Sequence, residues 1–141
     1  NSLAATLERQ LAGWQVQHPE IIVNSSLAIG PQPVADDLAM AVVRIIQEGL
    51  TNVVRHADAT QVDLAISRVA GWLLLTLADN GRGRSGQPSA QPGCGLGLAG
   101  MGERIAALGG HLQFEQPAGG GFRIFARLPD AVAQHSLEKF A

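Results

Sequence analysis

Apolar residues recur at helical spacing in two stretches of the first half of the chain. Residues 3–16 carry leucines and a tryptophan on one face, which predicts a helix that Pro19 ends. Residues 34–57 predict a second, longer helix. Its apolar stripe consists of Ala39, Val43, Ile46, Leu50, Val53 and Ala57. Between the two helices, the Ile- and Val-rich residues 20–27 predict a strand.

The second half of the chain predicts two pairs of strands around one further helix. The strands are expected over residues 60–68, 72–78, 111–116 and 122–128. The helix is expected over residues 98–108, where Gly109 and Gly110 close it. A loop rich in Gly, Pro, Ser and Gln precedes it over residues 80–94, and loops of this length in a small domain are usually functional or disordered.

The order of these elements predicts an α+β fold. Neighbouring strands that can form hairpins outnumber strand–helix–strand units. We therefore expect a two-layer α/β sandwich, with a mixed, mostly antiparallel sheet and helices on one face. The length of 141 residues suits one domain, which we assign to residues 1–129, followed by a C-terminal tail over residues 130–141.

Composition excludes several classes of function. The formal net charge is −2, and no cluster of Lys and Arg marks a nucleic-acid surface, so we expect no nucleic-acid partner. The one cysteine, Cys94, cannot form an internal disulfide and has no partners at zinc spacing, which fits a reducing compartment. No apolar stretch approaches the ~20 residues that a membrane span needs.

The long helix carries a polar stripe opposite its apolar one. Glu48, Asn52 and Arg55 are spaced so that they share one face. An amide oxygen and a carboxylate beside a cation could serve Mg²⁺ and phosphate, because Mg²⁺ prefers oxygen ligands and takes few of them from protein. Taken alone, the stripe fits a solvated helix face better.

A carboxylate and two glycines follow the strand at residues 72–78. Asp79 lies at the strand end, and Gly81 and Gly83 come directly after it. An ionised Asp accepts hydrogen bonds and can bind an exocyclic amine, while glycines let backbone approach a flat ring. The alternative is an ordinary Asn-Gly turn.

A third motif, at residues 95–102, is dense in glycine and leads into a helix. Free N–H groups at a helix N-terminus bind anions. Residues 95–100 match the dinucleotide fingerprint G-x-G-x-x-G, but that site requires a strand immediately before the glycines and an acid about 20 residues later. A Pro-rich loop precedes them here, so we reject the dinucleotide site; a flexible, glycine-rich helix start remains the alternative.

The order and spacing of these motifs resemble the ATP-binding domain of the histidine kinases that partner with NarL-type response regulators. Residues 47–57, 79–83 and 95–104 are similar to that family's N box, first glycine box and second glycine box, the last with its usual Gly-Met-x-Glu-Arg ending. The resemblance runs from roughly the first helix to Pro129. Within the family, residues 47–58 are most similar to the hexose-phosphate sensor kinases.

The resemblance implies the Bergerat fold of the GHKL superfamily, with ATP and Mg²⁺ as cofactors. The nucleotide-binding residues that it implies are Asn52, Arg55, His56, Asp79, Gly81, Gly83, Gly95, Leu96, Gly97, Leu98 and Met101. Asp79 would bond the adenine amino group, and Asn52 would coordinate Mg²⁺ as the metal ligand. The glycines after Asp79 would shape the base pocket, those at 95 and 97 would let the backbone approach the phosphates, and residues 80–94 would form the ATP lid.

Glu48 and Asn52 are the residues implied to be catalytic. Glu48 would polarise the site or a Mg²⁺-bound water, since the nucleophile of a kinase comes from its partner. Arg55 would lie near the phosphates, and His56 at the edge of the pocket. The family's phosphoacceptor histidine is followed directly by Asp. None of the four histidines here is followed by Asp, so none of them matches the phosphoacceptor. The family's usual Thr before the last strand is replaced by Phe122, and a water could take the place of the missing hydroxyl.

The activity implied by the resemblance is transfer of the γ-phosphate of MgATP to a histidine on the parent's dimerisation helices, for relay to a NarL/LuxR-type response regulator. The chain alone would be monomeric and phosphorylate nothing. The parent would be a homodimer at the inner membrane, with this domain in the cytoplasm. Alternatives are a GHKL ATPase, an anti-sigma-type serine kinase and an interaction module without ATP. The Gly-Met-x-Glu-Arg ending argues against the first two, and the intact Asn52 and Asp79 against the last.

Overall fold

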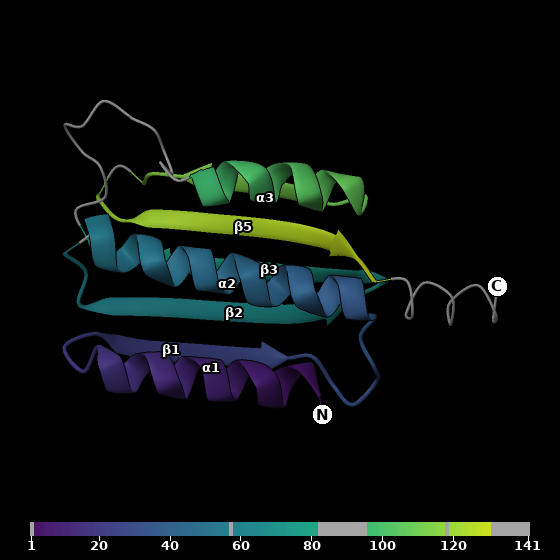
Figure 1. The fold of residues 1–141 in the computed structure, drawn as a ribbon, viewed down its shortest axis with the longest axis horizontal. Helices are drawn as coiled ribbons and strands as arrows, with labels where there is room; N and C mark the ends of the chain where they lie inside the picture. The colour runs from purple at the N-terminus through teal and green to yellow at the C-terminus, as the bar shows by residue number, and fades with distance from the viewer. Residues whose placement is uncertain (1, 57, 82–95, 118, 131–141) are drawn as a thin grey trace, which may run out of the picture.

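The fold is an open sheet with helices on one face, and the computed structural model describes residues 2–56, 58–81, 96–117 and 119–130 of it. Three helices lie side by side over five strands in the order β1-β2-β3-β5-β4 (Figure 1). The helices are α1 (Leu3–Gln17), α2 (Asp36–His56) and α3 (Leu96–Ala107). The strands are β1 (Ile22–Ala28), β2 (Gln61–Val69), β3 (Trp72–Asp79), β4 (His111–Glu115) and β5 (Phe122–Pro129). The predicted α+β, two-layer class is confirmed.

Strand pairing follows the predicted mixture. β1 runs parallel to β2, whereas β2–β3, β3–β5 and β4–β5 are antiparallel. The alternation along each strand turns one set of side chains toward the helices, because successive residues of a strand point to opposite faces. In β3 this set is Leu73, Leu75 and Leu77, all of them buried. The apolar core therefore lies between the sheet and the helix layer.

Helix α1 begins and packs as its sequence predicts. The Ser2 hydroxyl accepts a hydrogen bond from the Ala5 N–H at 3.1 Å, which satisfies one of the free donors of the first turn. Leu3, Leu7 and Leu11 are buried against the sheet. Helix α3 starts two residues before the predicted position and ends where Gly109, at φ +86°, turns the chain toward β4.

The buried face of α2 differs from the predicted stripe. Ile46, Leu50 and Val53 are buried as expected, but Ala39 and Val43 are only partly buried. The centre of the buried face instead contains Leu38, Ala41, Val42 and Ile45. The prediction was wrong here because α2 lies between two other helices, so a wider face than one stripe becomes buried. Ala57 lies outside the described residues.

Gly49 lets α2 lie directly on the sheet. A Cβ at this position would overlap the side chain of Leu77 and come within 3.1 Å of Ile124 Cδ1. Leu77 and Ile124 are cross-strand partners in β3 and β5. The helix therefore touches the seam between these two strands, one turn before its polar end.

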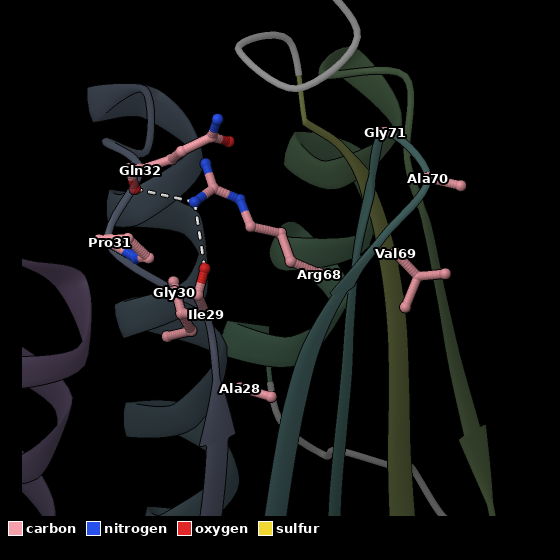
Figure 2. A pocket seen from close by; sticks show the side chains of 9 residues that line it. All are labelled: Ala28, Ile29, Gly30, Pro31, Gln32, Arg68, Val69, Ala70 and Gly71. Carbon is pink, nitrogen blue, oxygen red and sulfur yellow. Dashed lines mark hydrogen bonds between the residues drawn. The ribbon is translucent and has the colours of Figure 1, made fainter. Parts of the chain in front are cut away.

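Arg68 holds together the end of the sheet that lies away from the polar end of α2. Its guanidinium bonds the buried carboxylate of Asp130 through two nitrogens and donates to the carbonyls of Ile29, Gln32 and Pro33. Figure 2 shows Arg68 reaching from β2 to the loop that follows β1. All five guanidinium N–H groups have partners. Asp130, the first residue of the predicted tail, is fully buried, and its N–H bonds Gly71 O.

No helix in the described part of the chain combines the length and apolar character needed to cross a membrane.

The change Asp130→Ala is expected to lower the free energy of unfolding by about 3 kcal/mol, because it leaves a buried guanidinium without its counter-charge. The corresponding loss in Tm, roughly 10 °C, can be measured by calorimetry. The control is Arg123→Ala, which breaks the half-exposed Arg123–Glu115 pair and should cost at most about 1 kcal/mol. Equal losses in the two variants would contradict the role given to Asp130.

Candidate functional site

Asn52 and Asp79, two of the residues expected to bind nucleotide, lie at one end of the sheet. The last turns of α2 and the last residues of β3 point toward the same end, because α2 is followed by the start of β2 and β3 is antiparallel to β2 (Figure 1). Gly49 and Leu77 touch there. Asn52 lies three residues beyond that contact in α2, and Asp79 two residues beyond it in β3. The fold therefore brings the metal-ligand candidate and the base-binding candidate to the same edge.

Asp79 is the half-buried carboxylate of this edge. It points to the helix side of the sheet, since its cross-strand partners Val62 and Phe122 are both buried there. Its Oδ1 accepts the Gly81 N–H at 2.8 Å, and the backbone of Phe122 also bonds the carboxylate. Burial raises the pKa of Asp79, and these two hydrogen bonds oppose the rise. The carboxylate is thus fixed in direction but keeps acceptor capacity for a ligand.

The turn after Asp79 is held against β5 by two glycines. Gly120 and Gly121 have φ values of +103° and +90°, which residues with a side chain rarely adopt. A Cβ on Gly121 would overlap the carbonyl oxygen of Asp79, and one on Gly120 would lie 3.2 Å from Gly81 O. The loop before β5 can therefore run against the Asp79 turn only with glycine at these positions.

On its other side, the turn is bonded to the start of β2 by Asn80. From the sequence, Asn80 was placed in an Asn-Gly turn or at the start of the ATP lid, and it was given no bond to β2. Its partners lie about twenty residues earlier in the chain, and no local pattern indicates them. Gly119, Gly120 and Gly121 are consecutive in the sequence, but no local pattern indicates the contact of Gly120 and Gly121 with residues 79–81.

The side chains on the polar face of α2 differ in their exposure to solvent. Glu48 and Asn52 are half-buried, whereas Arg55 is exposed near the helix end. An amide oxygen at position 52 is the kind of hard ligand that Mg²⁺ accepts, together with phosphate and water oxygens. The residues present therefore fit a Mg²⁺ ion that arrives with a nucleotide. His56 ends α2, and its side chain lies outside the description.

The glycine-rich motif opens α3, as its sequence predicts. Leu96, Gly97 and Leu98 lie in the first turn of the helix, where free N–H groups can face an anion. Met101 is buried at 4% exposure, so its side chain packs α3 against the core. Gly83 and Gly95, with most of the predicted lid, lie outside the described residues.

Phe122 stands where the resembled family has Thr, and the structure shows what its ring contacts. It stacks on Phe114 of β4, with ring centroids 6.0 Å apart and planes at 19°. Its backbone still bonds Asp79. The replacement therefore removes a hydroxyl beside the carboxylate but keeps the backbone contact.

Two surface cavities lie elsewhere, around the loop that joins β1 to α2. One, of about 530 Å³, is lined by Arg68 and residues 28–32 and 69–71 (Figure 2). The other, of about 910 Å³, lies between α1 and the first turns of α2. Neither cavity is lined by Asn52 or Asp79. The N–H groups of the Arg68 guanidinium already donate to protein carbonyls and to Asp130.

Comparison with known proteins gives a consistent family. The model of the family described as histidine kinase-, DNA gyrase B-, and HSP90-like ATPase matches residues 37–132. The signal transduction histidine-protein kinase/phosphatase UhpB of Salmonella typhimurium is 33% identical over 116 residues, covering 79% of this chain and 22% of that protein. The sensor histidine kinase YxjM of Bacillus subtilis is 37% identical over 93 residues, covering 66% and 22%. The chain thus spans about a fifth of these relatives.

Solved structures agree with this result. The histidine kinase domain of the blue-light activated kinase from Erythrobacter litoralis EL346 superposes with a TM-score of 0.72 at 21% identity, covering 95% of this chain and 64% of that one, which supports the fold. Full-length ShkA, solved in complex with AMPPNP, gives a TM-score of 0.66 at 25% identity, covering 86% of this chain and 28% of that one. By matched residues and by fold, the chain belongs to the histidine kinase-, DNA gyrase B-, and HSP90-like ATPase family.

Proposed function

We propose that the chain binds MgATP at the edge formed by α2, β3 and the start of α3, and presents the γ-phosphate to a histidine on the dimerisation helices of its parent sensor kinase. The observation that carries the proposal is the half-buried Asp79 carboxylate, fixed by backbone N–H groups beside the polar end of α2. ShkA, on which this chain superposes, was solved in complex with AMPPNP, and this supports nucleotide binding as the function of the fold.

The chemistry follows from the groups at this edge. Asp79 accepts a hydrogen bond from the adenine amine, which orients the base against the glycine-containing turn. Asn52 offers an amide oxygen to Mg²⁺, whose charge offsets that of the phosphates. Arg55, at the exposed end of α2, adds a cation, and the first turn of α3 adds N–H donors. Glu48, half-buried one helical turn before Asn52, would polarise the site or orient a water bound to Mg²⁺.

Phosphoryl transfer requires little covalent chemistry from the protein, so positioning and charge neutralisation carry the rate. The nucleophile, the imidazole nitrogen of the parent's acceptor histidine, forms a bond to the γ-phosphorus while the bond to the β–γ bridging oxygen breaks and ADP leaves. A response regulator, of NarL type by resemblance, then receives the phosphoryl group. We propose a homodimeric parent anchored at the inner membrane, with this domain on the cytoplasmic side, and a monomeric state for the chain alone.

Calorimetric titration with MgADP is expected to show binding that the change Asp79→Asn weakens at least tenfold, because a charge-assisted hydrogen bond to the base is lost. The matched control is Asp63→Asn, which changes an exposed carboxylate of β2 that bonds Asn24. It should leave the affinity unchanged. Absence of heat at millimolar MgADP with the wild-type chain would refute nucleotide binding.

Asp79 should also cost stability at neutral pH. Because burial raises its folded-state pKa above the unfolded value of 3.8, the folded state binds the proton more tightly. The free energy of unfolding therefore falls as pH rises from about 3.8 through the raised pKa. Without ligand, the Tm of the Asp79→Asn variant minus that of wild type should increase between pH 4 and pH 7. A difference that is constant or decreases would show that the carboxylate carries no such penalty.

The kinase reaction can be separated from its alternatives by adding the parent's dimerisation helices and γ-labelled ATP. Label should appear on those helices and not on the chain itself, and a His→Gln change at the acceptor should abolish it. Steady release of phosphate without label on the helices would indicate a GHKL ATPase. Label on a partner's serine would indicate an anti-sigma-type kinase.

A further inference from the structure

Asn80 uses both polar ends of its side chain to bond one short segment. Its Oδ1 accepts hydrogen bonds from the N–H groups of Thr60 and Gln61, each at 2.9 Å. Its Nδ2 donates to Thr60 Oγ1 at 2.9 Å, and its backbone N–H donates to Gln61 O at 3.2 Å. These four bonds join the end of β3 to the start of β2.

The segment that Asn80 bonds is the one that follows α2. Residues 58–60 connect the end of α2 to β2, and Ala59 within this segment is buried. Thr60 O also accepts the Ile22 N–H at 2.9 Å, so the same segment is attached to β1. Asn80 therefore connects the Asp79 turn to the exit of the helix that carries Asn52.

We propose that Asn80 is a positioning residue for the nucleotide site: it keeps the Asp79 turn and the polar end of α2 at one fixed separation. The inference rests on the proposed nucleotide binding and names a residue through which that binding depends on the fold. Asn80 itself touches no ligand in this scheme, since its side chain is directed to Thr60 and Gln61.

The backbone alone does not complete this connection. The regular pairing of β2 with β3 reaches its last cross-strand pair at Val62 and Asp79. Beyond that pair the chain turns at Gly81, and the Asn80 amide supplies the acceptor for two consecutive N–H groups of the opposite strand. The side-chain oxygen of Asn80 therefore takes the place of a strand carbonyl that the turn no longer supplies.

The chemistry of the amide suggests a graded pair of variants. Asn80→Asp keeps an oxygen for both N–H groups, and the Thr60 hydroxyl can rotate to donate instead of accept. Asn80→Leu keeps the size of the side chain and removes every polar atom. Asn24→Leu is the matched control, because Asn24 makes one exposed bond, to Asp63 at 3.0 Å.

MgADP affinity is measured by calorimetry at 10 °C, after circular dichroism confirms that each variant is folded. We expect Asn80→Leu to weaken binding about tenfold, Asn80→Asp to stay within about threefold of wild type, and Asn24→Leu to equal wild type. In the Asp79→Asn background, Asn80→Leu should add little, because the group that it positions is already removed. If Asn80→Leu does not fold, Asn80→Ala removes the same bonds and takes its place.

The amide resonance of Gly81 gives a readout that general destabilisation does not move. This N–H bonds Asp79 Oδ1 at 2.8 Å. Its chemical shift in the ligand-free chain should change in Asn80→Leu and be kept in Asn80→Asp. Wild-type values for both the Gly81 shift and MgADP affinity in Asn80→Leu, with only a lower Tm, would overturn the inference alone. Failure of the wild-type chain to bind MgADP would instead overturn the proposed function on which it rests.

Discussion

Gly49 lets α2 rest on the seam between β3 and β5, and the geometry of the functional edge depends on that contact. A side chain at this position would overlap Leu77 and force the helix away from the sheet. Asn52 lies just beyond the contact on the helix, and Asp79 just beyond it on the strand. The two chemical groups of the site are therefore placed relative to one another by core packing, and a change in that packing would alter both.

The two ends of the sheet are stabilised by different means. At the end away from the site, the buried Arg68–Asp130 pair ties β2, the loop after β1 and the end of β5 together through side-chain bonds. At the end with the proposed site, the contacts involve the backbone. Two glycines of the loop before β5 contact the Asp79 turn, and Asn80 bonds this turn to β2. Glycine at positions 120 and 121 allows this close backbone contact, which a side chain would block.

A raised pKa at Asp79 is consistent with a group kept for binding at some cost in stability. Desolvation penalises the carboxylate, and two backbone hydrogen bonds only oppose that penalty. The side chain of Phe122 does not relieve this penalty, because its ring stacks on Phe114 and offers no hydroxyl to the carboxylate. In the proposed site, recognition of the base would therefore depend on Asp79 and on the backbone that holds it.

The sequence alone determined the element order, the fold class and the candidate residues, because hydrophobic spacing and glycine clusters are local properties. It also indicated that Asn52 and Asp79 act together, through resemblance. Tertiary structure decided the rest. The width of the buried face of α2 depends on neighbouring helices, the Arg68–Asp130 pair joins residues 62 positions apart, and Asn80 bonds a segment twenty positions away. No local pattern encodes these partners, since each bond exists only after the strands have paired and the helix has settled on the sheet.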